Sequence, residues 1–153
     1  MLKIKSYVKV NSIEEAYELN QKKTAIVLGG MVWLKMGNRN ISTAIDLSGL
    51  GLAGIQETDE EFVIGCMTTL RELETDKRLN EYTQGAVRES VRHIVGVQFR
   101  NCATVGGSIW GRYGFSDVLT MFLGMDTWVE LHNAGKIPLT EFVDRKKDND
   151  ILV

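Results

Sequence analysis

The sequence predicts an α+β protein built as two lobes, the first spanning residues 1–56 and the second residues 57–153. The first third of the chain alternates short apolar runs with amphipathic segments, which is typical of a β-α-β-α-β unit. The rest carries further helix-capping signals, followed by one alternating strand and a turn. A chain of 153 residues can form one compact domain or two small lobes that share a cleft.

The first lobe has a strong helix signal near its start. Ser12 and Glu15 form a capping box, which predicts a helix that begins at Ile13 and ends near the Lys22-Lys23 pair. The fully apolar run 25–28 then predicts a buried strand.

Glycine interrupts the pattern after that strand. Gly29-Gly30 breaks the apolar run, residues 31–36 predict a helical turn, and Gly37 is expected to close it. Residues 43–47 predict the next strand, which completes the β-α-β-α-β lobe.

The second lobe opens with a strand that leads into a helix. Residues 62–65 predict the strand, and Thr69 with Glu72 forms a second capping box at the start of the helix. Residues 86–94 place apolar side chains at helical spacing, and Gly96 is expected to end that helix.

The last third begins with a glycine-rich stretch, residues 102–115, in which we expect a Gly-Gly turn. Ser116-Asp117 can cap a helix that reaches Gly124. Residues 127–132 then alternate as a strand, and residues 133–135 predict a hairpin turn.

The final residues change character abruptly. Residues 144–150 are highly charged and are expected to be mobile, whereas residues 151–153 are apolar and resemble the start of a strand. We therefore expect the natural gene product to continue beyond this chain. Apolar surface left uncovered in the isolated chain favours self-association into a homo-oligomer.

Composition excludes several classes of protein. The net charge of -2 and the pI near 5.7 give no sign of a nucleic-acid or membrane surface. No apolar run is long enough to cross a bilayer, and residues 1–5 lack the apolar core of a signal peptide. The default expectation is a cytoplasmic protein.

Metal-ligating side chains are sparse. Cys66 and Cys102 are the only cysteines, and they are too far apart in the sequence for a zinc or iron–sulfur motif. The two histidines, His93 and His132, are also isolated from other metal-ligating residues. We expect no metal site, and both cysteines are expected to be buried as small apolar side chains.

Two Gly-Gly segments have a composition suited to phosphate binding. Residues 26–32 run from a strand through Gly29-Gly30, and residues 103–108 place Gly106-Gly107 beside hydroxyl side chains. Glycine lets backbone amides approach a phosphate closely, and a helix N-terminus adds a favourable dipole. Taken alone, each segment is a weak signal for phosphate binding and is somewhat better explained as an ordinary tight turn. Neither matches the Rossmann or P-loop motif.

A set of motifs in the same order along the chain identifies a resemblance. The sequence resembles the FAD-binding domain of the flavin (medium) subunit of molybdenum hydroxylases, the family of xanthine dehydrogenases and carbon monoxide dehydrogenases. The block R-N-x-A-T-x-G-G at residues 100–107 is the most specific match. The other matching segments are residues 12–16, 28–30, 45–48, 64–73, 116–117 and 137–142.

The resemblance implies a flavin-binding fold of the vanillyl-alcohol-oxidase-like (PCMH) type, a small βαβ lobe and a larger α+β lobe with FAD between them. It implies that residues of the first Gly-Gly segment wrap the pyrophosphate, mainly through backbone amides. The implied cofactor-binding residues are Ile26, Val27, Leu28, Gly29, Gly30, Met31, Val32, Trp33, Ile94, Ala103, Thr104, Gly106, Gly107, Ser108, Asp117 and Ile151. Asp117 is expected to accept hydrogen bonds from ribose or ribityl hydroxyls, and it also suits a helix N-terminus.

The sequence departs from the family pattern in three places. Met31-Val32 replaces a Thr-Asp pair, which removes a hydroxyl and a carboxylate. Arg112 begins a segment that replaces A-S-P-x-A-D, and it either pairs with phosphate or faces solvent. The C-terminal domain of the family, which covers part of the flavin, is absent.

The resemblance implies a flavoprotein component of an oxidoreductase rather than a hydroxylase in its own right. Electrons would pass from a molybdenum-cofactor large subunit through a [2Fe–2S] small subunit to FAD, and then to NAD⁺ or another acceptor. Since the flavin carries the redox chemistry, we assign no catalytic side chain. The alternative is a non-catalytic assembly module that keeps the fold without binding flavin.

Overall fold

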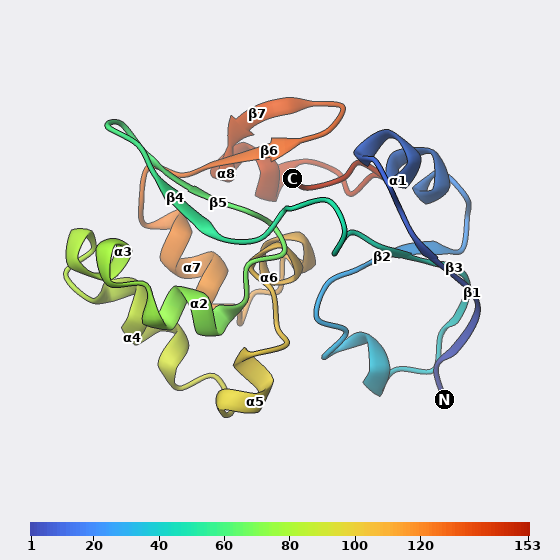
Figure 1. Cartoon of the computed structure of the whole chain (residues 1–153), viewed down its shortest axis with the longest axis horizontal. Coiled ribbons are helices and arrows are strands. Elements are labelled where there is room, and N and C mark those ends of the chain that lie inside the picture. Colours follow the sequence, from blue (N-terminus) through green and yellow to red (C-terminus); the bar gives the residue numbers. More distant parts are fainter.

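The computed structural model describes all 153 residues, and its N-terminal part is a small parallel sheet. Strands β1 (Lys3–Lys9), β2 (Ala25–Leu28) and β3 (Asn40–Asp46) pair in the order β1-β3-β2, and both pairings are parallel. Helix α1 (Ile13–Asn20) connects β1 to β2, and the short 3₁₀ helix η1 (Leu34–Met36) lies between β2 and β3 (Figure 1). The predicted β-α-β-α-β order is therefore present.

Helix α1 begins where the sequence predicts. The Ser12 hydroxyl accepts a hydrogen bond from the Glu15 amide, at 3.1 Å. The Glu15 carboxylate instead accepts from the amide of Asn11, one residue before the cap, so the capping box is displaced by one position. The helix ends at Asn20, before the predicted lysine pair, and the Gln21 side chain donates to the carbonyl of Tyr17.

The turn expected over residues 31–36 is shorter than predicted. Only Leu34–Met36 forms a helical turn, and Gly37 follows it as expected. The reason is Met31, whose φ of 57° lies in the left-handed region and cannot belong to a right-handed helix. Residues 29–33 therefore form an open loop at the end of β2.

The remainder of the chain is mainly helical and carries two hairpins. Strands β4 (Ile55–Glu57) and β5 (Phe62–Ile64) form the first antiparallel pair, followed by helices α2 (Leu70–Thr75) and α3 (Lys77–Tyr82). The predicted capping box is present, because Thr69 and Glu72 exchange side-chain and backbone hydrogen bonds.

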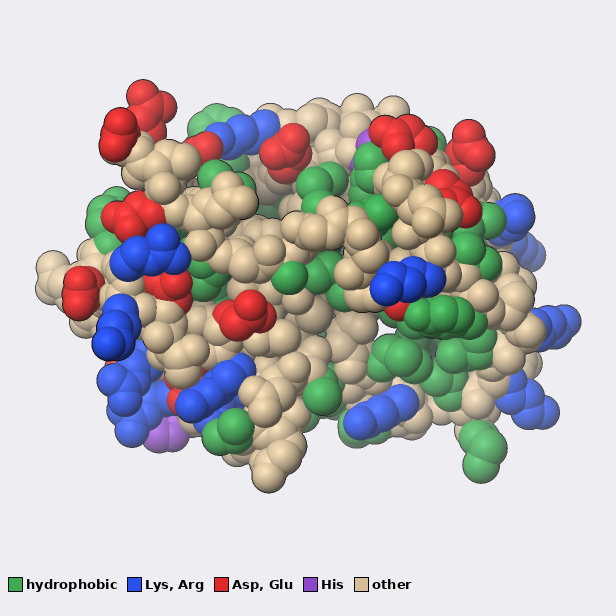
Figure 2. All heavy atoms as spheres, viewed as in Figure 1, with side chains coloured by type: hydrophobic (Ala, Val, Ile, Leu, Met, Phe, Trp, Pro, Cys, Tyr) green, Lys and Arg blue, Asp and Glu red, His purple; other side chains and the backbone are tan.

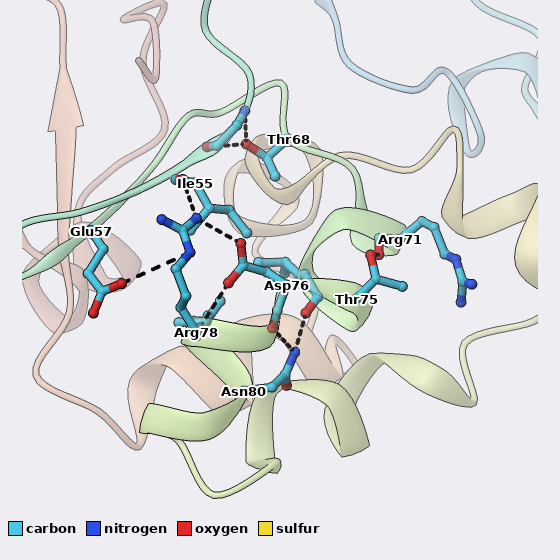
Figure 3. Close-up of polar contacts among 11 residues, drawn as sticks. Ile55, Glu57, Thr68, Arg71, Thr75, Asp76, Arg78 and Asn80 are labelled. Carbon is cyan, nitrogen blue, oxygen red and sulfur yellow. Dashed lines mark hydrogen bonds and ion pairs between the residues drawn. The ribbon is translucent and has the colours of Figure 1, made fainter.

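A polar network fixes the corner between α2 and α3 (Figure 3). The Asp76 carboxylate accepts from the Leu79 amide and from the guanidinium of Arg78, which also donates to the carbonyl of Ile55 in β4. The Asn80 side chain donates to the carbonyls of Leu73 and Asp76. The first hairpin and the helical corner are thereby held together.

Helix α4 (Ala86–Arg92) is followed by the short α5 (Val97–Arg100). Gly96 was expected to end the first of these helices, but α4 ends at Arg92 with His93 as its C-cap, and Gly96 caps the start of α5. Between them Val95 has a φ of 51°, which is rare for a β-branched residue, so the chain turns sharply here.

The glycine-rich stretch is more ordered than predicted. Helix α6 (Val105–Gly111) runs through it, so Gly106-Gly107 lie in the first helical turn and not in a Gly-Gly turn. The Thr104 hydroxyl caps this helix by accepting from the Gly107 amide at 3.1 Å. The Thr104 cap therefore offsets part of the helix-propensity cost of the two glycines.

The C-terminal elements follow the prediction until the last residues. Helix α7 (Asp117–Leu123) is capped by Ser116 and ends at Gly124, and β6 (Trp128–Leu131) pairs with β7 (Gly135–Pro138) before α8 (Leu139–Asp144).

The charged segment after α8 is held in place at its end, contrary to expectation. Asp150 is buried, and its carboxylate accepts from the amides of Asn133 and Ala134 at 2.9 and 3.0 Å. Leu152 then bridges to Leu131, so residues 151–153 lie along β6.

Two main apolar cores organise the molecule, and a third, small cluster of Leu28, Ile41 and Ala44 lies on the parallel sheet. The larger one lies among α2, α4, α6, α7, α8 and β6, and the second lies between α1 and the parallel sheet. Cys66 and Ile151 pack into the second core although they follow the sheet in sequence, so they join the two parts of the chain. Cys66 is buried as predicted, whereas Cys102 is exposed, because it lies in the turn before α6.

No helix in the structure is both long enough and apolar enough to span a bilayer.

Candidate functional site

A cleft of about 760 Å³ lies where the parallel sheet meets α5 and α6. Its walls come from the loop after β2, the turn before α5, helix α6, the start of α7 and residues 147–152. All sixteen residues that the sequence predicts to bind the cofactor line this one cleft. Figure 2 shows apolar side chains bordering a hollow in the right half of the molecule, where Figure 1 places the parallel sheet.

The two glycine segments touch each other instead of facing each other across a gap. A Cβ on Gly30 would overlap the carbonyl oxygen of Cys102, and a Cβ on Gly29 would lie 2.7 Å from the Thr104 hydroxyl oxygen. Glycine is therefore required here for the contact between two backbone segments. The sequence pattern left open whether these glycines serve a tight turn or the approach of a phosphate, and it did not predict this contact between the two segments.

The loop after β2 carries a run of unpaired hydrogen-bond donors. None of the six backbone amides from Gly29 to Leu34 donates to a protein acceptor. All six residues line the cleft. Successive free amides beside a left-handed residue, here Met31, form a concave site suited to an anion. We call residues 29–34 the amide loop.

The second glycine segment has few free donors. The amides of Val105 and Gly106 donate to the carbonyls of Thr68 and Cys66, both at 2.8 Å, and the amide of Gly107 is used by the Thr104 cap. A Cβ on Gly106 would lie 2.6 Å from the Cys66 carbonyl oxygen. This segment therefore supports the amide loop by packing, and only the Thr104 amide remains without a protein acceptor.

The remaining predicted residues differ in exposure. Asp117 is exposed at the first turn of α7, and its carboxylate accepts no hydrogen bond from another protein group, so it is available to a hydroxyl donor. Ile151 lies on the inner wall, with only 1% of its surface exposed. The carbonyl of Ile94 accepts from Arg100, which fixes the rim of the cleft.

Arg112 takes neither of the two predicted positions. Its guanidinium lies 3.9 Å from the centre of the Phe142 ring and donates to the carbonyl of Arg145. Desolvation lowers the pKa of this guanidinium from its ordinary value, although an arginine remains charged at any physiological pH. Arg112 is therefore part of the packing around α8 and does not line the cleft.

Several residues of the cleft were missed by the sequence analysis. Two of them are cations, Arg39 and Lys147. Four are aromatic: Phe99, Trp110, Tyr113 and Phe115. The Lys147 ammonium donates to the carbonyl of Gly111 at 3.0 Å, and this hydrogen bond holds the charged segment 144–150 beside the cleft. No local pattern marks these side chains, because they reach the site only through the packing of loops that are distant in sequence.

Two groups with distinct electrostatics lie at or near the cleft: the Cys66 thiol, and the ion pair between Glu74 and Arg100. Burial raises the pKa of Cys66 to about 11, so this thiol stays protonated at neutral pH. Behind the rim, Glu74 and Arg100 form a buried ion pair at 2.8 Å. The same Arg100 holds the Ile94 carbonyl, so the pair positions the turn that contains Val95.

Comparison with protein families gives one match that covers nearly the whole chain. Residues 2–152 match the family described as the FAD binding domain in molybdopterin dehydrogenase.

Individual relatives agree with this match. The chain is 28% identical over 147 residues to the alpha subunit of the 6-hydroxypseudooxynicotine dehydrogenase complex of Paenarthrobacter nicotinovorans, an alignment that covers 90% of this chain and 49% of the relative. A cyanide-inactivated form of Cu,Mo-CO dehydrogenase superimposes with a TM-score of 0.82 at 26% identity, covering 91% of this chain and 52% of the other.

Quinoline 2-oxidoreductase from Pseudomonas putida 86 superimposes with a TM-score of 0.85 over 96% of this chain and 56% of the other. At 18% identity this likeness concerns the mixed α/β fold alone. The chain thus spans about half the length of the relatives it matches.

Proposed function

Since the chain belongs to the family of FAD-binding domains in molybdopterin dehydrogenases, we propose that the amide loop binds the pyrophosphate of its cofactor, FAD. The six free amides of residues 29–34 carry this proposal. A pyrophosphate needs several converging donors, and charge-assisted hydrogen bonds from backbone amides are among the stronger ones available. Because these donors belong to the backbone, the replacement of Thr-Asp by Met31-Val32 leaves them in place.

The other predicted residues have supporting parts in this proposal. Ile26, Val27 and Leu28 end the strand that presents the loop. Ala103, Thr104 and Gly107 form the surface against which it packs, and Gly106 and Ser108 continue the wall of the cleft along α6. Asp117 accepts from sugar or ribityl hydroxyls, while Ile94 and Ile151 provide apolar walls. In this reading the fold is the two-lobed PCMH type, with residues 1–56 and 57–153 on the two sides of FAD.

The proposed role of the whole protein is electron transfer within a molybdenum hydroxylase. FAD supplies the redox centre when bound, and the chain's own residues bind it, orient it and limit its contact with water. Electrons would reach this domain from [2Fe–2S] clusters of a small subunit, which receives them from a large subunit with the molybdenum cofactor. They would leave to NAD⁺ or another acceptor. A flavin-binding role is favoured over a flavin-free assembly module by the unpaired amides of the cleft.

The cofactor assignment is tested with the purified chain. We expect FAD to bind with a higher affinity than FMN, because FMN lacks the pyrophosphate and the adenosine. Titration calorimetry measures both affinities, and chromatography of the flavin released by heat identifies what the protein carries. Release of FMN, or no measurable affinity for either flavin, would contradict the proposal.

The partner assignment needs the protein in its native cells. Affinity purification of the tagged protein should recover two further subunits together with molybdenum and iron, measured by elemental analysis. Recovery of the flavoprotein without either metal would reject this part of the proposal while leaving FAD binding intact.

A further inference from the structure

Three aromatic side chains meet at the wall of the cleft: Trp33, Tyr113 and Phe115, which we call the aromatic cluster. Each of them lines the cleft. Trp33 belongs to the amide loop, whereas Tyr113 and Phe115 lie between α6 and α7. The cluster therefore joins two loops that are about 80 residues apart in the chain.

The three rings are in mutual contact. Tyr113 and Phe115 stack with their centroids 5.2 Å apart and an angle of 14° between the planes. Trp33 approaches Phe115 edge-on, with centroids 5.9 Å apart and planes at 61°, and lies 6.4 Å from Tyr113. These arrangements are the offset-stacked and edge-to-face geometries that aromatic rings prefer.

The rings nevertheless remain largely open to solvent. The exposed fractions are 55% for Trp33, 45% for Tyr113 and 67% for Phe115. Large rings usually lie buried in a core, as Phe142 does in this protein. An exposed group of rings on the wall of a ligand-sized cleft offers faces that a planar ligand can cover.

We propose that the aromatic cluster is a stacking surface for one of the two planar ring systems of the bound dinucleotide. This inference rests on the proposed function, because it takes the amide loop as the site of the pyrophosphate. Trp33 is part of that loop, so a ring attached to the pyrophosphate through its sugar or ribityl chain is within reach. The cluster contains no charged side chain, and the chemistry it recognises is therefore a flat π-system, adenine or isoalloxazine.

The test compares leucine substitutions inside and outside the cluster. Trp33→Leu and Phe115→Leu should each weaken FAD binding roughly tenfold, the usual loss when a base no longer stacks on an aromatic ring. Trp33→Phe, which keeps a planar ring, should lose much less. The matched control is Trp128→Leu, since Trp128 lies on β6 outside the cleft and is 53% exposed. Titration calorimetry on the full chain measures each dissociation constant.

Two smaller probes identify the ring. If the leucine variants lose affinity for ADP alone, the surface stacks on adenine. If they lose affinity for FMN alone, it stacks on isoalloxazine. Either result supports the inference. Equal losses for both probes would indicate a distorted cleft and overturn it. Unchanged or tighter FAD binding with a lowered melting temperature of the free protein would also overturn it, since the rings would then only pin two loops together. Failure of the wild-type chain to bind FAD would remove the proposed function itself.

Discussion

Glu74 is a largely buried carboxylate, and its charge state matters for the stability of the fold. Its side chain is 12% exposed and that of its partner Arg100 is 6% exposed. Burial alone would raise the pKa of Glu74, but hydrogen bonds and charge interactions with Arg100 and Arg71 outweigh it, so the pKa is lowered. A lowered pKa in the folded state means that ionised Glu74 stabilises the fold, and that this stabilisation is lost as the pH falls.

Glu74→Gln should therefore destabilise the protein by about 3 kcal/mol at neutral pH, because it leaves the Arg100 charge buried without its partner. The difference in the free energy of unfolding between wild type and variant should be constant at pH values above the ordinary glutamate pKa of about 4.3. It should shrink as the pH falls through the lower pKa of the folded state. Urea unfolding at a series of pH values measures it.

An exposed ion pair provides the control for this substitution. Glu89 and Arg92 lie 2.8 Å apart on α4, but both side chains are largely exposed. Glu89→Gln should leave the free energy of unfolding nearly unchanged, because solvent screens an ion pair at the surface. Equal losses for the two variants would show that burial gives Glu74 no special weight.

The conformation of the amide loop depends on its packing against residues 102–107. A side chain on Gly30 would overlap the backbone of Cys102, and one on Gly29 would overlap the Thr104 hydroxyl, so neither would fit. The loop is therefore shaped by the start of α6, and its six free amides keep their arrangement only while the two backbones remain in contact.

Gly30→Ala should push these two segments apart. We expect a stability loss of about 1–3 kcal/mol from overpacking, and a fall in FAD affinity of roughly tenfold for each amide hydrogen bond that is lost. Gly96→Ala is the control, because its new Cβ would meet only a flexible Gln98 side chain at 3.5 Å. Thermal unfolding and FAD titration measure the two effects, and wild-type FAD affinity in a folded Gly30→Ala variant would show that the loop is only a turn.

At the scale of the whole molecule, the cleft draws its walls from the parallel sheet and from the helical part. Cys66 and Ile151 already connect these parts by packing into the core between α1 and the sheet. A ligand that contacts both sides should bind the folded state alone and stabilise both parts together.

FAD at about one hundred times its dissociation constant should stabilise the protein by about 2.7 kcal/mol. For a chain of this size, that corresponds to a rise in melting temperature of roughly 5–10 °C. Scanning calorimetry measures the rise, and the Gly30→Ala variant at the same FAD concentration should show a smaller one. Two separate transitions, of which only one responds to FAD, would contradict a shared site.

Local chemistry in the sequence determined most of the elements, and the resemblance to a known family identified part of the lining of the cleft. Ser12, Thr69 and Ser116 begin helices where their side chains can cap free amides, and the apolar run 25–28 forms a strand of the parallel sheet. The resemblance to flavin-binding domains identified sixteen residues that the structure brings to one cleft. β1, by contrast, was implied by the order of elements but not located, because this edge strand is exposed along most of its length and carries little apolar signal.

Only the tertiary structure decided how those residues are used. It made Gly106-Gly107 part of a helix, turned Arg112 onto Phe142, buried Asp150 and left Cys102 exposed. It also separated the amide loop, whose donors are free, from the second glycine segment, whose donors are used within the protein. The physical reason is that hydrogen-bond partners and ring contacts across a cleft depend on distances between remote segments, and no local pattern of residues encodes those distances.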